Sequence, residues 1–190
     1  SATKLHADDT PVDVLQPGRG TTKTGRLWTY VRDDRPSGSV DPPAMWLRYT
    51  PDRKGEHPQK HLKDFRGILQ ADGYAGFDRL YEDDTITQAA CWAHVRRKFY
   101  DLEQADGSPV AAEAVRRIGT LYEIEAEIRG KPPHERCAER KARAGPLLHE
   151  MKAWLESTLT KIARKSALAV AIRYALTRWR ELLGTLASPV

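Results

Sequence analysis

Residues 67–72 read Gly67-Ile-Leu-Gln-Ala-Asp72, a short apolar run that closes on a carboxylate. Such a run predicts a buried β-strand with the aspartate directly at its end. The stretch from Leu5 to Asp8 has a similar form and predicts a second, short strand that ends in an acid. An aspartate in that position is costly unless it is exposed, hydrogen-bonded or bound to a cation. The sequence therefore predicts two acids at strand ends, within a fold that the surrounding segments define.

The segments around these two strands alternate between strand and helix patterns. A cluster of turn-forming residues at 17–20 and a polar loop at 33–43 separate the first three strands. The resulting order, β-β-β-α-β-α-β-α, predicts a mixed five-stranded sheet covered by helices, which is the order of ribonuclease H-like domains. The predicted strands lie at 5–8, 26–32, 44–50, 67–72 and 86–92, and the predicted short helices at 57–65, 74–81 and 94–102.

The second half of the chain has the pattern of helices throughout. Ser108-Pro109 is a helix start, and the run from Gly130 to Pro133 is a helix stop. Apolar residues recur at helical spacing in three stripes, at 111–128, 147–162 and 168–183. We expect two domains: an α/β ribonuclease H-like core at 1–102 and an all-α insertion at 103–190.

Composition and charge narrow the class of protein. The 190 residues carry a net charge of +5, and the apolar runs are far shorter than the roughly 18 residues that span a bilayer. The absence of a signal peptide and the presence of only two cysteines favour a cytoplasmic location without a membrane partner. The basic clusters suit a polyanion such as DNA, although a solvated surface explains them equally well. They lie at Arg19, Lys23 and Arg26, at Arg53 and Lys54, and at Arg96, Arg97 and Lys98.

The two strand-end acids have a catalytic and a structural interpretation. Carboxylates from separate strands can converge to hold Mg²⁺, which prefers oxygen ligands. Two such ions about 4 Å apart can activate an oxygen nucleophile against a phosphodiester. An aspartate at a strand end also often caps a turn or a helix. Spacing alone favours this structural interpretation.

Four motifs, in the right order along the chain, change this balance. Together they resemble the insertion sequence 66 family of DDE-type transposases, over nearly the whole chain. The motifs are His-Ala-Asp-Asp-Thr-Pro at 6–11, Lys-Thr-Gly-Arg-Leu-Trp at 23–28 with Tyr-Val-Arg-Asp at 30–33, Leu-Gln-Ala-Asp-Gly-Tyr-Ala at 69–75, and Cys-Trp-Ala-His-Val-Arg-Arg-Lys-Phe at 91–99.

The resemblance implies a function for particular residues. Asp8 and Asp72 would be the first two members of the catalytic acidic triad and would bind Mg²⁺ or Mn²⁺. Asp9 and His94 would lie next to these two acids and help to position them, without binding the metal themselves. The implied reaction is DNA strand cleavage and strand transfer on double-stranded transposon ends and target DNA, together with other transposase protomers. The residues expected to contact DNA are Arg96, Arg97, Lys98, Lys23 and Arg26.

The third carboxylate of the triad departs from the family pattern. The family carries it in an Asp-Asn-Asn-x-x-Glu-Arg motif after the helical insertion, and this sequence lacks that motif. Glu181 lies near that position in chain order, but we expect its carboxylate to face away from the sheet or into solvent. We therefore expect this chain, which begins at Ser1 and resembles a piece of a longer protein, to be inactive alone.

Other interpretations remain open at this point. The chain could be a non-catalytic remnant that binds DNA or other transposase chains, or a ribonuclease H-like nuclease. Cys91 and His94 have the C-x-x-H spacing of zinc ligands, but two further ligands are missing, so a strand-to-helix junction facing the active site is favoured. His57 and His61 could share a helix face, and solvated side chains are the favoured interpretation.

Overall fold

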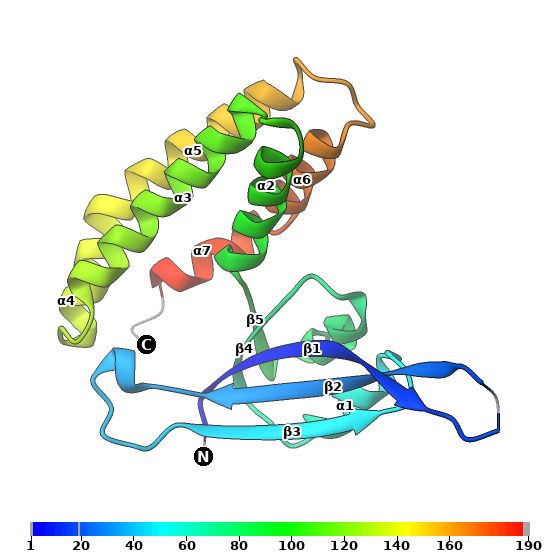
Figure 1. The fold of residues 1–190 in the computed structure, drawn as a ribbon. Helices are drawn as coiled ribbons and strands as arrows, with labels where there is room; N and C mark the ends of the chain where they lie inside the picture. The colour runs from blue at the N-terminus through cyan, green and yellow to red at the C-terminus, as the bar shows by residue number, and fades with distance from the viewer. Residues whose placement is uncertain (1, 19, 188–190) are drawn as a thin grey trace. The chain divides into compact units, whose positions relative to one another are not determined.

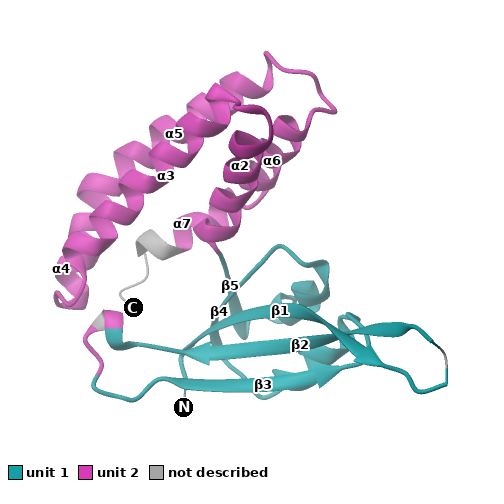
Figure 2. Cartoon of the chain, viewed as in Figure 1, with its two compact units in different colours: residues 1–35, 40–90 teal, residues 36–39, 91–190 magenta. Residues whose placement is uncertain are grey.

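The computed structural model describes residues 2–18 and 20–187. The chain forms two compact units, shown in Figure 2. The first comprises residues 1–35 and 40–90, and the second comprises residues 36–39 and 91–190. The division into compact units places residues 91–102 with the helices that follow them. The boundary at residue 102 between a catalytic core and a helical insertion remains a prediction.

The first unit contains the mixed five-stranded sheet that the sequence predicts (Figure 1). Its strand order is β3-β2-β1-β4-β5. The first three strands pair antiparallel, whereas β4 and β5 run parallel to β1, which is the ribonuclease H-like arrangement. The strands are β1 (Lys4–Leu15), β2 (Thr22–Arg32), β3 (Ala44–Thr50), β4 (Gly67–Ala71) and β5 (Ile86–Ala90).

Strand β1 is much longer than the predicted segment 5–8, because it continues past both acids to Leu15. The extension was not predicted because it contains Pro11, and proline cannot donate a backbone hydrogen bond. Strand β4 pairs with β1 only as far as His6. Beyond that point β1 continues its ladder with β2, so Pro11 occupies an edge position where its missing N–H is tolerated. The predicted turn at 17–20 follows, although Arg19 lies outside the described residues.

The core of the first unit lies on one face of the sheet. Strand alternation places Ala7 of β1 and Leu69 of β4 on this face, against the buried Trp28. The Trp28 indole Nε1 donates a hydrogen bond of 2.8 Å to the Thr50 hydroxyl, so the one polar atom of this buried ring is satisfied.

Two short helical segments accompany this core. They are α1 (Glu56–His61), shorter than the predicted 57–65, and the 3-10 helix η2 (Ala75–Tyr81). The expectation of solvated histidines on α1 is wrong. His57 Nε2 lies 2.6 Å from Asp52 Oδ1, and His61 Nδ1 lies 2.9 Å from the Tyr30 hydroxyl. Burial, with the nearby Arg48 charge, lowers the pKa of His61.

The backbone conformation at position 67, at the start of β4, requires glycine. Its φ is +136°, and a Cβ there would lie 2.3 Å from the Thr3 carbonyl oxygen. We expect Gly67→Ala to destabilise the protein by about 2 kcal/mol, measured by urea unfolding. Gly119→Ala is the control, because Gly119 lies within a helix and a methyl group there would meet no neighbouring side chain within 4 Å. It should stabilise by up to about 1 kcal/mol. Equal stabilities of the two variants would contradict this interpretation.

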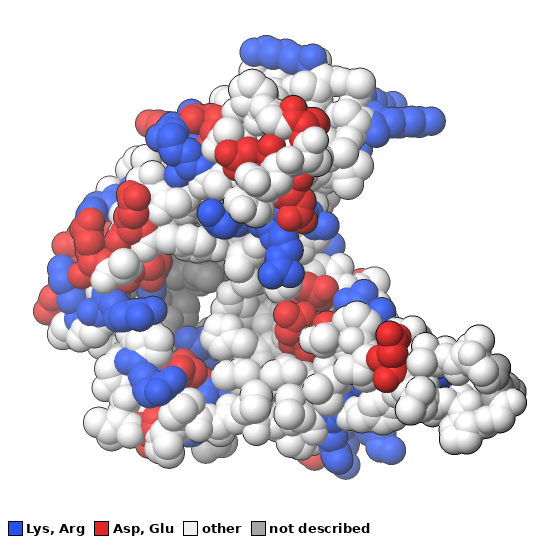
Figure 3. Space-filling view, viewed as in Figure 1, with Lys and Arg blue, Asp and Glu red and all other residues white. Residues whose placement is uncertain are grey.

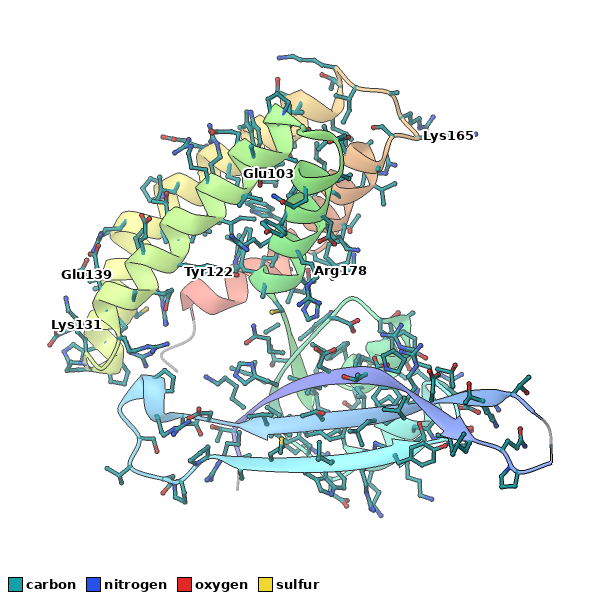
Figure 4. All side chains as sticks on the ribbon, viewed as in Figure 1. Glu103, Tyr122, Lys131, Glu139, Lys165 and Arg178 are labelled. Carbon is teal, nitrogen blue, oxygen red and sulfur yellow. The ribbon has the colours of Figure 1, made fainter. Side chains whose placement is uncertain are left out.

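The second unit is helical in all its described residues from 103 to 187, apart from its turns. Figure 4 labels Lys131 at the turn from α3 to α4 and Lys165 at the turn from α5 to α6. The helices are α2 (Trp92–Asp106), α3 (Pro109–Ile128), α4 (Pro133–Glu139), the π-helix η3 (Arg140–Ala144), α5 (Gly145–Leu159), α6 (Ala167–Thr177) and α7 (Trp179–Ala187).

Two features of this unit differ from the sequence prediction. The stripe at 168–183 forms two helices, because the chain breaks at Arg178, whose backbone N–H bonds back to Ala175 and Leu176. Apolar spacing continues through the break, with Ile172 and Leu182 both buried, so the pattern alone could not reveal it. Helix α4 was also missed, since its side chains are mostly polar.

The surface of the helical unit carries charges of both signs, and some of them form ion pairs. Figure 3 shows acidic and basic side chains interspersed over α3 and α5 rather than one large patch of a single sign. Arg143 Nη1, for example, lies 2.6 Å from Glu127 Oε2, and both side chains are exposed. In the part of the chain that the structure describes, every helix is too short or too polar to cross a bilayer.

Candidate functional site

The two predicted catalytic acids follow the paired parts of two neighbouring strands, β1 and β4. The parallel register of β1 and β4 places His6 beside Gln70. Continuing this register for two residues sets Asp8 beside Asp72, although the ladder itself ends at His6. Adjacent strands lie about 4.8 Å apart, so the backbones that carry the two acids are neighbours. Their assignment as catalytic residues remains a prediction that this register supports.

Each of these acids has one oxygen bound to nearby backbone. Asp8 is exposed, and its Oδ1 accepts a 2.8 Å hydrogen bond from the Asp9 N–H. Asp72 Oδ1 accepts a 3.0 Å bond from the Tyr74 N–H in the turn after β4. The turn-capping interpretation is therefore correct for Asp72, and the turn uses only one of its two oxygens.

Asp9 occupies a different environment from Asp8. Its side chain is fully buried, on the same face as Ala7, because alternate residues of a strand face opposite sides. Arg53 Nε lies 3.0 Å from each of its oxygens, and Arg53 Nη2 lies 2.7 Å from Oδ1. Arg26 Nη1 adds a bond of 3.1 Å to Oδ2. Asp9 therefore anchors two arginines.

Arg53 is a residue of this site that the sequence did not reveal. It lies between β3 and α1, and its Nη2 reaches Asp72 Oδ2 at 3.3 Å as well as Asp9. The Arg53 guanidinium also lies 4.0 Å from the centre of the Tyr74 ring. Burial acts to lower the pKa of Arg53, but the hydrogen bond and charge of Asp9, with the charge of Asp72, outweigh it and raise that pKa. In the sequence Arg53 was only part of a basic cluster, with no signal for its partners.

Cys91 and His94 form the predicted strand-to-helix junction. Cys91 is the N-cap of α2, and the His94 N–H bonds to the Cys91 carbonyl. Burial acts to raise the pKa of the Cys91 thiol, but hydrogen bonds from the His94 side chain and from the backbone N–H groups of His94 and Ala93 outweigh it and lower that pKa. Among the described residues, no group of three His, Cys, Asp or Glu side chains is placed to hold a metal. The supporting role of His94 beside the acids remains a prediction.

The predicted DNA contacts lie in varied surroundings. Lys23 and Arg97 are exposed, whereas Arg26 is engaged by Asp9. Arg96 lies over the Tyr100 ring at 5.5 Å, and Lys98 Nζ lies 4.5 Å from the centre of the Tyr174 ring. Roles of these residues in DNA binding remain predictions.

Of the two orientations expected for Glu181, exposure of its carboxylate to solvent is wrong for one oxygen, because Oε2 is buried. This oxygen has no hydrogen-bond partner among the described residues, and an orientation away from the sheet remains a prediction. The neighbouring residue, Leu182, is fully buried. The short helix α7 therefore buries an apolar side chain and, next to it, one oxygen of an acidic side chain.

The acids of the first unit fit a hard divalent cation. Mg²⁺ is commonly held by one or two carboxylates, with water and substrate oxygens as its other ligands. Asp8 and Asp72, in neighbouring register, supply that number of carboxylates. A nitrogen- or sulfur-rich site, as zinc prefers, is absent from the described part of the chain.

Comparisons with known proteins agree with the motifs. A family model described as "Transposase IS66 family" matches residues 1–189. The uncharacterized protein y4hP of Sinorhizobium fredii is 42% identical over 195 residues, which cover 94% of this chain and 35% of that protein. The uncharacterized protein y4qI of the same organism is 39% identical over 187 residues, covering 95% and 34%. The chain spans about a third of the length of the curated relatives it matches. No solved structure matches it.

Proposed function

Because this chain belongs to the IS66 family of transposases, we propose that it supplies two of the metal-binding acids for DNA strand cleavage and strand transfer in the complete protein. The observation that carries this proposal is the parallel pairing of β1 with β4 up to His6 and Gln70, two residues before Asp8 and Asp72. Acids from two strands at one position are the ligands that a phosphoryl-transfer site needs.

The protein's own residues position this chemistry. Asp8 and Asp72 provide the oxygen ligands, and the Tyr74 N–H fixes one oxygen of Asp72 at 3.0 Å. Asp9 lies behind them as a buried anchor for Arg26 and Arg53. A bound Mg²⁺ or Mn²⁺ would activate the attacking oxygen and stabilise the leaving oxygen of a phosphodiester.

The substrates follow from the same family membership. We propose double-stranded transposon ends and target DNA as substrates, and further transposase protomers as partners. Exposed basic residues such as Lys23 and Arg97 would contact phosphate, which fixes the position of DNA without reading its sequence. Contacts to the edges of the bases, rather than to phosphate, are the ones that recognise a DNA sequence.

Asparagine substitutions in the full-length protein test this proposal. Asp8→Asn and Asp72→Asn each remove one negative ligand, so we expect Mn²⁺ binding at least about tenfold weaker and a matching loss of end-specific nicking. Asp64→Asn, at an exposed acid of the same unit, is the control and should change neither. Nicking that persists in both site variants would contradict the proposal. Nicking without strand transfer would instead support a nuclease, and DNA binding without either would support a non-catalytic role.

A further inference from the structure

The contacts of Arg53 go beyond what a buried ion pair requires. Asp9 already has Arg26 as a partner, 3.1 Å away, yet Arg53 binds both oxygens of Asp9 and extends to Asp72. Arg53 thus joins a buried acid of β1 to the predicted metal-binding acid that follows β4. The Arg53 guanidinium places a positive charge beside Asp72 Oδ2, the oxygen that the Tyr74 N–H does not bind.

We propose that Arg53 is a positioning residue that competes with the divalent metal for Asp72 and thereby sets the metal affinity of the site. This inference rests on the proposed function and deepens it. Arg53 contacts Asp72 Oδ2 and would retreat to Asp9 when a metal binds. Its contact with Asp72, at 3.3 Å, is longer than its contact with Asp9, at 2.7 Å, so the bond to Asp72 is the one that yields.

The surroundings of Arg53 favour this exchange. Its side chain is 35% exposed, so the guanidinium can move without opening the core. The Tyr74 hydroxyl donates a hydrogen bond to the Arg53 carbonyl, and the Tyr74 ring lies against the guanidinium. The hydrogen bond holds the Arg53 backbone in place, and the Tyr74 ring supports the guanidinium while it shifts between the two carboxylates.

The expected direction follows from how Asp72 is held. The Tyr74 N–H anchors Oδ1 independently of Arg53, so loss of Arg53 does not release the Asp72 carboxylate. It does remove a unit positive charge that opposes the metal. At a partly exposed site this repulsion corresponds to about a tenfold change in affinity.

The experiment measures Mn²⁺ binding to this chain by electron paramagnetic resonance of the free ion. Arg53→Gln should bind Mn²⁺ about tenfold more tightly than the unaltered chain. Arg53→Lys keeps the charge and should stay within about threefold of the unaltered chain. The matched control is Lys54→Gln, which removes the same charge from an exposed neighbour that contacts Asp52 instead, and should leave affinity unchanged. Equal affinities for Arg53→Gln and Lys54→Gln, or no binding by either, would overturn the inference.

Two further measurements separate this inference from the proposed function. Asp72→Asn added to Arg53→Gln should cancel the gain; a gain that persists places the ion elsewhere and overturns both proposals. If Asp72→Asn weakens binding while Arg53→Gln equals the unaltered chain, only the competition by Arg53 is wrong. Should Arg53→Gln fail to fold, nitrogen resonances of the Arg53 side chain in the unaltered chain replace it. They should shift on addition of Mg²⁺, and unchanged resonances would overturn the inference.

Discussion

The 190-residue chain alone should nick transposon-end DNA at least about a hundredfold more slowly than the full-length protein in Mg²⁺ or Mn²⁺. Among the described residues, no group of three His, Cys, Asp or Glu side chains could hold a metal, so no third acid joins the proposed ligands Asp8 and Asp72 there. The family's third acid lies in a motif that includes two asparagines, and this sequence contains no asparagine. With one ligand missing, the attacking oxygen is misplaced, and a displacement of about 1 Å can cost about a hundredfold in rate.

The comparison needs a version extended through the third acidic motif and the same extended version with Asp72→Ala. The extended protein should nick the DNA, and the Asp72→Ala version should be as slow as the 190-residue chain. A short chain that matches the extended one and loses its activity on Asp72→Ala would show that the third acid is not needed for nicking.

The order of strands and helices in the first unit was predictable from the sequence. Strand β3 matches its predicted range at both ends, because the turn-forming residues before it and the polar stretch after it mark its limits. Strand β4 was predictable for the same reason, with Gly67 at its start and Asp72 just beyond its end. Helix α3 followed from Ser108, whose hydroxyl accepts a hydrogen bond of 3.3 Å from the Ala111 N–H.

Contacts between distant segments were not predictable. Arg53 and Asp9 are 44 residues apart, and no local pattern links them. The assignment of Asp9 as a supporting residue came from its position beside Asp8 in a motif, whereas its complete burial depends on the whole sheet. The long extension of β1 was hidden for a similar reason, since Pro11 is acceptable only where one side of the strand has no partner.

The burial of Asp9 also makes its charge part of the fold. A buried carboxylate is expensive to desolvate, and its four bonds to Arg26 and Arg53 offset that cost. Both arginines are partly exposed, at 25% and 35% of their side chains, so water can hydrate them if Asp9 is lost. The cost of removing Asp9 therefore falls toward the lower end of the range for a broken buried ion pair.

We expect Asp9→Ala to destabilise the protein by about 3 kcal/mol, a shift of about 150-fold in the folding equilibrium. Two guanidiniums lose their shared acceptor, and the deleted carboxylate leaves a gap beside Ala7 in the core face. The measurement is urea unfolding followed by tryptophan fluorescence, since the fully buried Trp28 lies opposite Asp9 in the β1–β2 register. Asp13→Ala, at an exposed acid of the same strand, is the matched control and should change stability by less than about 0.5 kcal/mol. An Asp9→Ala variant as stable as Asp13→Ala would show that the arginine contacts of Asp9 contribute nothing to folding. It would also show that Asp9 does not anchor Arg53.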